Sequence, residues 1–172
     1  MRLIAVLLLL FAAPVAATPT EPFSNIDGGT ISLSDFAGRP VLLVNTASQC
    51  GFTGQYAGLQ ALYDTYREAG LVVLAVPSDD FNQELASATE VKEFCEVQFG
   101  LDLPMTDITP VIGAEAHPVY AWIRDQTGFT PSWNFNKVLI DAAGEIVATY
   151  GATIRPDAPR IVTTIEALLK DR

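Results

Sequence analysis

The chain contains two cysteines, Cys50 and Cys95, whose side chains could carry redox chemistry. They do not form a CxxC pair, so the dithiol motif of thioredoxin-type oxidoreductases is absent. A cysteine thiolate is a nucleophile that can be oxidised to a sulfenic acid, and a second thiol can condense with that acid to form a disulfide. The two cysteines are therefore compatible with such a redox cycle or with a single structural disulfide.

Metal chemistry is a weaker interpretation of the same residues. The single histidine, His117, precedes a proline, which is typical of a residue at a helix start, and we assign it no catalytic role. A zinc site made from two cysteines and one histidine would lack the usual ligand spacing and a fourth ligand. No metal site is predicted.

The position of Cys50 between two predicted elements favours the catalytic interpretation. Residues 41–44 form a continuous apolar run, typical of a strand buried on both faces, and a helical pattern begins at Tyr56. Open α/β sheets place their sites in loops at the carboxyl ends of strands. The amides at the start of the following helix, which Thr53 is expected to cap, would favour a thiolate at Cys50.

The other elements are predicted from apolar runs, turn residues and caps. In chain order they are a hairpin around residues 27–29, a buried strand at 71–76, a helix from a capping box at Ser87 to Gly100, a helix opening at His117, a hairpin over 138–148 and a last helix over 161–169. A βαβ unit followed by ββα predicts an α/β, thioredoxin-like fold in which helices flank a central mixed sheet.

Residues 1–17 have the layout of a secretory signal peptide. Arg2 precedes an apolar run at residues 3–11, and small residues follow at 12–17. The apolar run is too short to cross a bilayer, which takes roughly 20 residues. We therefore expect residues 1–17 to be removed and a single domain, residues 18–172, to be exported to the periplasm or beyond, with no membrane insertion after cleavage.

The charge balance restricts the partners. Ten lysines and arginines stand against twenty aspartates and glutamates, which gives a formal net charge of −10. Nucleic acids and anionic membrane surfaces repel such a domain. A large anionic substrate is disfavoured for the same reason.

Three sequence blocks carry a resemblance to a known family. Residues 44–63 read VNTASQCGFTGQYAGLQALY, residues 76–84 read VPSDDFNQE, and residues 133–141 read WNFNKVLID. In this order they resemble the three characteristic blocks of the glutathione peroxidase family, and the similarity extends from about Phe23 to the end of the chain. The second block differs in carrying Asp79 and Asp80, where many members have uncharged residues.

The resemblance implies a set of site residues. The family uses a redox cysteine or selenocysteine, a glutamine, a tryptophan and an asparagine, which fall here on Cys50, Gln83, Trp133 and Asn134. Side-chain amides and an indole N–H are donors without charge, and they can stabilise the sulfur anion and the oxygen that leaves it. The resemblance therefore implies the reduction of hydrogen peroxide and organic hydroperoxides, with no metal and no organic cofactor.

Cys95, in the string KEFCEVQFG, matches the resolving cysteine of many cysteine-containing members. Members with two cysteines typically use a thioredoxin-like reductant, so we expect such a donor, or glutathione, as the partner. Residues 123–132 are short and lack the longer loop associated with tetrameric members, which implies a monomer.

Helix geometry makes a specific prediction about the two cysteines. Cys95 lies eight positions beyond Ser87, so at about 1.5 Å per residue it is ~12 Å from the sheet edge that carries Cys50. A disulfide needs Cα atoms within roughly 4.4–6.8 Å. The cysteines should not bond in the reduced fold, and the helix that carries Cys95 must unwind locally after Cys50 is oxidised.

Three alternatives compete with this interpretation. A peroxiredoxin would need a proline seven residues and a threonine three residues before the cysteine, where Leu43 and Ala47 stand, so that match fails. An exported domain without activity, held by a structural Cys50–Cys95 disulfide, stays open, because disulfides persist outside the cytosol. A redox relay to a partner protein would use the same chemistry and also stays open.

Overall fold

The computed structural model describes residues 18–170. The run predicted as a signal peptide lies outside these residues. In chain order the elements are β1 (Phe23–Ser24), β2 (Thr30–Ile31), the 3₁₀ helix η1 (Leu33–Phe36), β3 (Val41–Thr46), α1 (Gln55–Tyr66), β4 (Val72–Pro77), α2 (Ala88–Phe99), α3 (Pro118–Thr127), β5 (Lys137–Ile140), β6 (Ile146–Tyr150) and α4 (Pro159–Lys170).

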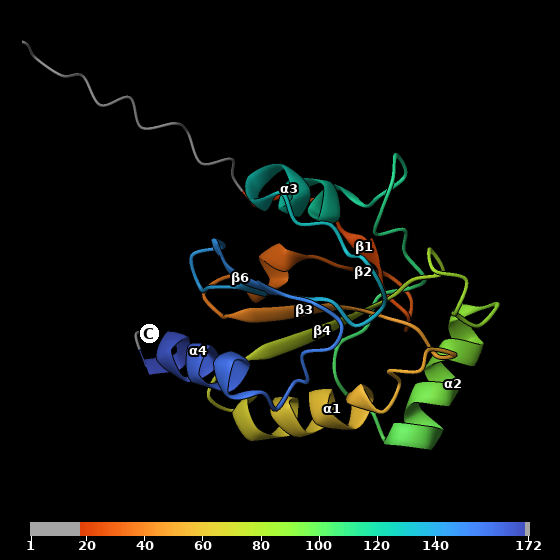
Figure 1. Cartoon of the computed structure of the whole chain (residues 1–172), viewed down its shortest axis with the longest axis horizontal. Helices are drawn as coiled ribbons and strands as arrows, with labels where there is room; N and C mark the ends of the chain where they lie inside the picture. Colours follow the sequence, from red (N-terminus) through yellow and green to blue (C-terminus); the bar gives the residue numbers. More distant parts are fainter. Residues whose placement is uncertain (1–17, 171–172) are drawn as a thin grey trace, which may run out of the picture.

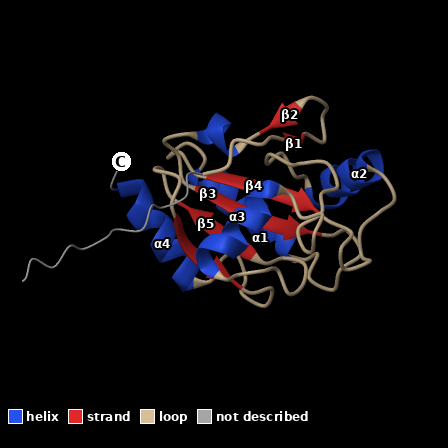
Figure 2. Cartoon of the chain, turned by 90° about the horizontal axis from the view of Figure 1, so that it is seen from above, coloured by secondary structure: helices blue, strands red, loops and turns tan. Residues whose placement is uncertain are grey.

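The sheet has the strand order β4-β3-β5-β6 (Figures 1 and 2). β3 and β4 are parallel, with Val41 opposite Val72, as a βαβ crossover through α1 requires. β5 runs antiparallel to β3, and β6 antiparallel to β5. This is the predicted thioredoxin-like arrangement, and its two central strands come from opposite halves of the chain.

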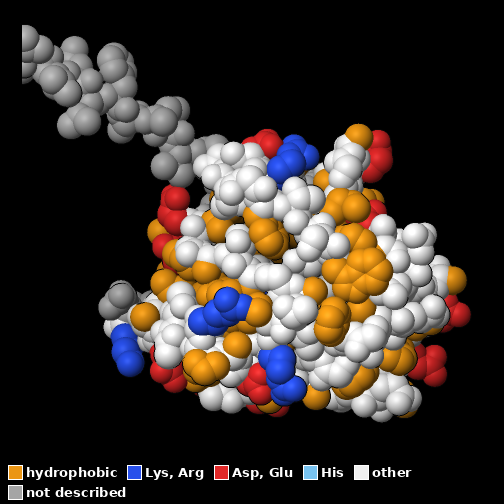
Figure 3. Space-filling model, viewed as in Figure 1, with side chains coloured by type: hydrophobic (Ala, Val, Ile, Leu, Met, Phe, Trp, Pro, Cys, Tyr) orange, Lys and Arg blue, Asp and Glu red, His pale blue; other side chains and the backbone are white. Residues whose placement is uncertain are grey.

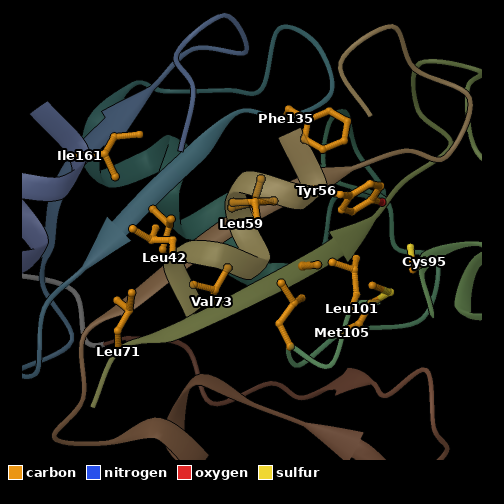
Figure 4. Packing of buried hydrophobic residues seen from close by; sticks show 14 of the residues in the cluster. Leu42, Tyr56, Leu59, Leu71, Val73, Cys95, Leu101, Met105, Phe135 and Ile161 are labelled. Atoms are coloured by element: carbon orange, nitrogen blue, oxygen red, sulfur yellow. The ribbon is translucent and has the colours of Figure 1, made fainter. Parts of the chain in front are cut away.

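Helices cover both faces of the sheet. α1 and α4 lie on one face and α3 on the other, while α2 lies beyond the end of the sheet (Figure 1). Alternate residues of β3 enter the two cores: Leu42 and Val44 face the α1 side, and Val41 and Leu43 face the α3 side. Tyr56, Leu59 and Ile161 fill the first core (Figure 4). Because β3 is buried on both faces, its end is a rigid base for the loop that carries Cys50.

The two ends of α2 lie at the residues that the sequence predicts. The Ser87 side chain accepts a hydrogen bond from the Glu90 N–H at 3.3 Å, which confirms the predicted cap at the start of α2. Gly100 ends the helix with φ at 61°, a left-handed conformation that favours glycine. Within residues 18–170, no helix has the length and apolar character needed to cross a membrane.

Candidate active site

Cys50 lies in the loop between β3 and α1, at the carboxyl end of β3, as predicted. Its side chain is 4% exposed, and the Phe52 N–H donates a hydrogen bond to its sulfur at 3.4 Å. A backbone donor at this place interacts more strongly with sulfur as negative charge develops on it. The turn after Cys50 therefore directs one backbone donor at its sulfur.

The predicted cap at Thr53 is wrong. α1 begins at Gln55, Gly54 is its cap residue, and no side chain caps the helix. The chain instead makes consecutive turns, in which the Thr53 N–H donates to the Cys50 carbonyl at 3.1 Å and the Gln55 N–H to the Phe52 carbonyl at 2.8 Å. Because these carbonyls already accept the first amides, the helix start needs no side-chain acceptor.

Gln83 comes from the loop that follows β4. Its backbone carbonyl accepts the Gln49 N–H at 2.8 Å, next to Cys50 in the chain. Its side-chain Oε1 accepts a hydrogen bond from Asn134 Nδ2 at 3.0 Å. The structure thus brings together two of the predicted donors, and it ties Gln83 to the Cys50 loop.

Trp133 and Asn134 lie in the loop that leads into β5. Trp133 is 40% exposed and its ring packs against Phe81, with ring centroids 5.4 Å apart. Asn134 is fully buried, and its Oδ1 has no hydrogen-bond partner within residues 18–170. Among residues 18–170, the Phe52 N–H donates the hydrogen bond to the Cys50 sulfur. The side chains of Gln83 and Asn134 bond to each other.

Asn45, at the end of β3, holds the Trp133 loop in place. Its Nδ2 donates to the Trp133 carbonyl at 3.0 Å, and its Oδ1 accepts the Asn136 N–H at 3.1 Å. The Asn136 side chain also donates to the Trp133 carbonyl. Asn45 was not among the predicted site residues, although a polar residue inside the apolar strand 41–46 was a signal for it.

Cys95 lies on α2 and is 1% exposed. Both cysteines are free in the structure. Burial raises the pKa of the Cys95 thiol to about 12, and the nearby Glu84 carboxyl acts in the same direction. Cys95 is therefore a protonated and unreactive thiol while α2 is folded.

Comparison with known proteins decides the family. The family model for glutathione peroxidase matches residues 21–124. The chain is 39% identical to the glutathione peroxidase of Lactococcus lactis over 138 residues, which cover 77% of this chain and 88% of that protein. It is 40% identical to the hydroperoxy fatty acid reductase gpx1 of Synechocystis over 158 residues, which cover 84% of this chain and 90% of that protein. The chain belongs to the glutathione peroxidase family.

A solved structure of a similar protein supports the fold. The crystal structure of Trgpx in its apo form superposes with a TM-score of 0.69 at 28% sequence identity, covering 88% of this chain and 94% of that chain. The protein is a peroxidase with a thioredoxin-like fold.

The two unusual aspartates of this peroxidase support its loops. Asp80 Oδ2 accepts the N–H groups of Val111 and Ile112 at 2.6 and 3.0 Å, so it fixes the segment before α3. Asp79 Oδ1 accepts the Glu84 N–H at 3.1 Å and closes the turn that presents Gln83. Both carboxylates accept hydrogen bonds from backbone N–H groups.

His117 also has a structural role, because its ring stacks on Phe23 and its Nδ1 accepts the Val119 N–H at the start of α3.

Lys137, the first residue of β5, is fully buried beneath the site. Its Nζ donates to Gln55 Oε1, the Phe135 carbonyl and the Ile154 carbonyl at 2.6, 2.7 and 2.6 Å, which uses all three donors of an ammonium group. Lys137 therefore joins α1, the Trp133 loop and the segment before α4. Lys137 was not among the predicted site residues, since lysine is almost never fully buried.

Replacing Lys137 by Met should lower the free energy of unfolding by about 2–4 kcal/mol at neutral pH, because it leaves buried oxygen acceptors without donors. Denaturant unfolding would measure this, with Lys92→Met as the matched control. Lys92 forms partly exposed ion pairs with Asp27 and Glu96, and such pairs contribute little. Equal destabilisation by the two changes would contradict the structural role of Lys137.

The same variant should alter the pH dependence of stability. Burial lowers the pKa of Lys137 to about 7, below the ordinary lysine value. Between about pH 7 and pH 10 the unfolded chain therefore binds the proton that the folded chain has released, so the Lys137 contribution to stability rises with pH. The difference in unfolding free energy between the parent and Lys137→Met should grow across this range. A difference in unfolding free energy that stays constant from pH 7 to pH 10 would contradict the lowered pKa of Lys137.

Proposed function

We propose that this peroxidase reduces hydrogen peroxide and organic hydroperoxides through Cys50. The Cys50 thiol gives up its proton, the thiolate attacks one peroxide oxygen, and the O–O bond breaks. The leaving oxygen takes up the released proton and departs as water or an alcohol, and Cys50 becomes a sulfenic acid. The observation that carries the proposal is the pair of hydrogen bonds made by Gln83, one to Gln49 beside Cys50 and one to Asn134. These bonds support a site in which the amide side chains of Gln83 and Asn134 act together beside the Cys50 loop.

We infer that Trp133 contributes to the site in two ways. Its indole N–H is a donor that can serve the leaving oxygen, as the family resemblance implies. Its ring and Phe81 also present apolar surface beside the loop. Figure 3 shows hydrophobic side chains across this face of the molecule, with one group to the right of its centre. This supports apolar hydroperoxides as substrates, in line with the name of the Synechocystis relative.

We propose that Cys95 resolves the oxidised enzyme. Its thiol condenses with the Cys50 sulfenic acid to give a disulfide and water, and a thioredoxin-like protein or glutathione then reduces the disulfide. Because Cys95 is buried in the folded α2, this step requires local opening of the helix. The net charge of −10 disfavours glutathione, which is anionic, so a thioredoxin-like donor is the preferred partner.

We propose that the enzyme acts as a monomer, because residues 123–132 lack the longer loop associated with tetrameric members of the family.

Steady-state peroxide consumption, measured in parallel with thioredoxin and with glutathione, tests this cycle. Replacing Cys95 by Ser should leave the consumption of the first equivalent of peroxide intact and reduce turnover with thioredoxin to the background rate. Unchanged thioredoxin turnover in this variant would reject Cys95 as the resolving residue. A parent protein without free thiols before peroxide is added would instead support the structural-disulfide alternative.

We also propose that the enzyme works outside the cytosol. The support is the basic, apolar and small-residue layout of residues 1–17. N-terminal sequencing of the protein recovered from the periplasm or the medium should find a mature chain that begins near Thr18. Recovery of uncleaved protein in the cytosol alone would contradict export.

A further inference from the structure

A buried carboxyl lies directly behind the Cys50 loop. Glu84 is 8% exposed, and its Oε1 accepts the Ser48 N–H at 2.9 Å and the Leu85 N–H at 2.8 Å. Its second oxygen, Oε2, is shielded from solvent and has no hydrogen-bond partner within residues 18–170. A buried carboxylate oxygen without a partner is costly, so its retention suggests a chemical role.

Glu84 belongs to a cluster that connects the Cys50 loop to α2. Tyr56 interacts electrostatically with both Glu84 and Cys95, and the Tyr56 hydroxyl end points toward the Cys95 sulfur (Figure 4). Cys95 in turn interacts with Glu84. The side-chain oxygens of Thr46, Ser48 and Tyr56 are buried as well. The Tyr56 hydroxyl interacts with Thr46 and Cys95, and Ser48 interacts with Glu84, whose Oε2 keeps no partner in the described part of the chain. The cluster is therefore polar, and it has unused capacity to hold a proton or a buried water.

The resolving step needs such a group. When Cys95 attacks the Cys50 sulfenic acid, the Cys95 S–H bond breaks and the S–S bond forms, while the S–O bond of the sulfenic acid breaks and hydroxide leaves. The thiol proton must reach that hydroxide to give water, so thiol and sulfenic acid yield disulfide and water with no further reactant. Because the thiolate and not the thiol is the attacking nucleophile, a proton acceptor beside the approaching Cys95 would speed the reaction.

We propose that Glu84 accepts the Cys95 thiol proton during disulfide formation and passes it to the departing hydroxide, and that it therefore governs the resolving step but not the attack on peroxide. This inference rests on the proposed role of Cys95. Glu84 is fixed to the reactive loop through Ser48, so it stays beside Cys50 when α2 opens and Cys95 approaches.

The protonation state of Glu84 fits this role. Burial raises the pKa of its carboxyl against the opposing effect of the Ser48 and Leu85 hydrogen bonds, and Asp79 raises it further. The titratable groups that face it are Asp79 from its own loop, Tyr56 from α1 and Cys95 from α2. A general base works best when its pKa lies near the working pH, and the upward shift moves Glu84 in that direction.

The test separates the two half-reactions in the full-length enzyme. The reduced protein is mixed with one equivalent of hydrogen peroxide and quenched at intervals with a thiol-blocking reagent. Mass spectrometry then follows the sulfenic acid and the disulfide. Glu84→Gln keeps the Oε1 acceptor and removes the charge, and Glu96→Gln is the matched control, since Glu96 also interacts with Cys95 but is exposed on α2.

Glu84→Gln should form the sulfenic acid at the parental rate and the disulfide about 100-fold more slowly. Glu96→Gln should behave like the parent in both steps. The rate of disulfide formation in the parent should rise with pH through the Glu84 titration, and this inflection should be absent from Glu84→Gln. Glu84→Asp, which restores a carboxylate, should recover part of the rate.

Three results would overturn the proposal. The first is disulfide formation in Glu84→Gln at the parental rate and with the parental pH profile. The second is an equal slowing of both half-reactions, because Glu84 would then only support the loop. If Glu84→Gln does not fold, a pH-independent rate of disulfide formation in the parent would reject the proposal. A parent that never forms the Cys50–Cys95 disulfide would contradict the proposed function itself, before any Glu84 variant is compared.

Discussion

The Cys50→Ser enzyme is expected to lose peroxide reduction entirely while keeping its fold. Serine nearly matches cysteine in shape, and its oxygen can accept the Phe52 N–H that now bonds to the sulfur. A hydroxyl is protonated at neutral pH and is a poor nucleophile toward an O–O bond, whereas a thiolate is a strong one. Peroxide consumption in the presence of thioredoxin should fall to the background rate.

The control for this change is Cys95→Ser, which should still consume one equivalent of peroxide. Circular dichroism and the unfolding midpoint should match those of the parent, because Cys50 is buried in a core that tolerates an isosteric change. Turnover retained by Cys50→Ser would remove Cys50 from the mechanism, whatever the family resemblance implies.

Replacing Gln83 by Ala should slow the first step by about 10²–10³-fold, the usual cost of losing one donor to a developing anion. The change removes the side chain that bonds to Asn134 but keeps the backbone carbonyl that accepts the Gln49 N–H. The Cys50 loop should therefore keep its position. The measurement is the second-order rate constant for sulfenic acid formation.

Gln126→Ala is the matched control for this change, because Gln126 is an exposed glutamine on α3. It should react at the parental rate. If Gln83→Ala also reacts at that rate, Gln83 supports the loop without taking part in the chemistry, and the family assignment of this residue does not apply to this chain.

Much of the fold could be predicted because its signals are local. The apolar runs at 41–44 and 71–76 form the parallel strands β3 and β4. Ser87 caps the start of α2 and Gly100 ends it, as their residue types predict. The error at Thr53 also has a local cause. Backbone turns from Cys50 onward satisfy the first amides of α1, and a residue's capping propensity does not reveal where such turns occur.

The supports of the site could not be predicted in the same way. Asn45, Glu84 and Lys137 act through partners far away in the sequence, and each is a polar residue that pattern reasoning assigns to the surface. Lys137 opens an apolar strand, and Glu84 follows the predicted Gln83. Their positions beside the motifs were the available signals, but only the three-dimensional structure supplies the buried acceptors and donors that give these residues their roles.

The central pairing of β3 with β5 has a consequence for how the enzyme becomes active. Asn45 bonds to Asn136, 91 residues further along the chain, and Gln83 bonds to Asn134. Contacts between such distant segments form late, because a long loop must close first. Until residues 134–136 reach the end of β3, the Cys50 loop and Gln83 lack the hydrogen bonds that hold them in the native arrangement. The candidate site is therefore completed only when β5 pairs with β3.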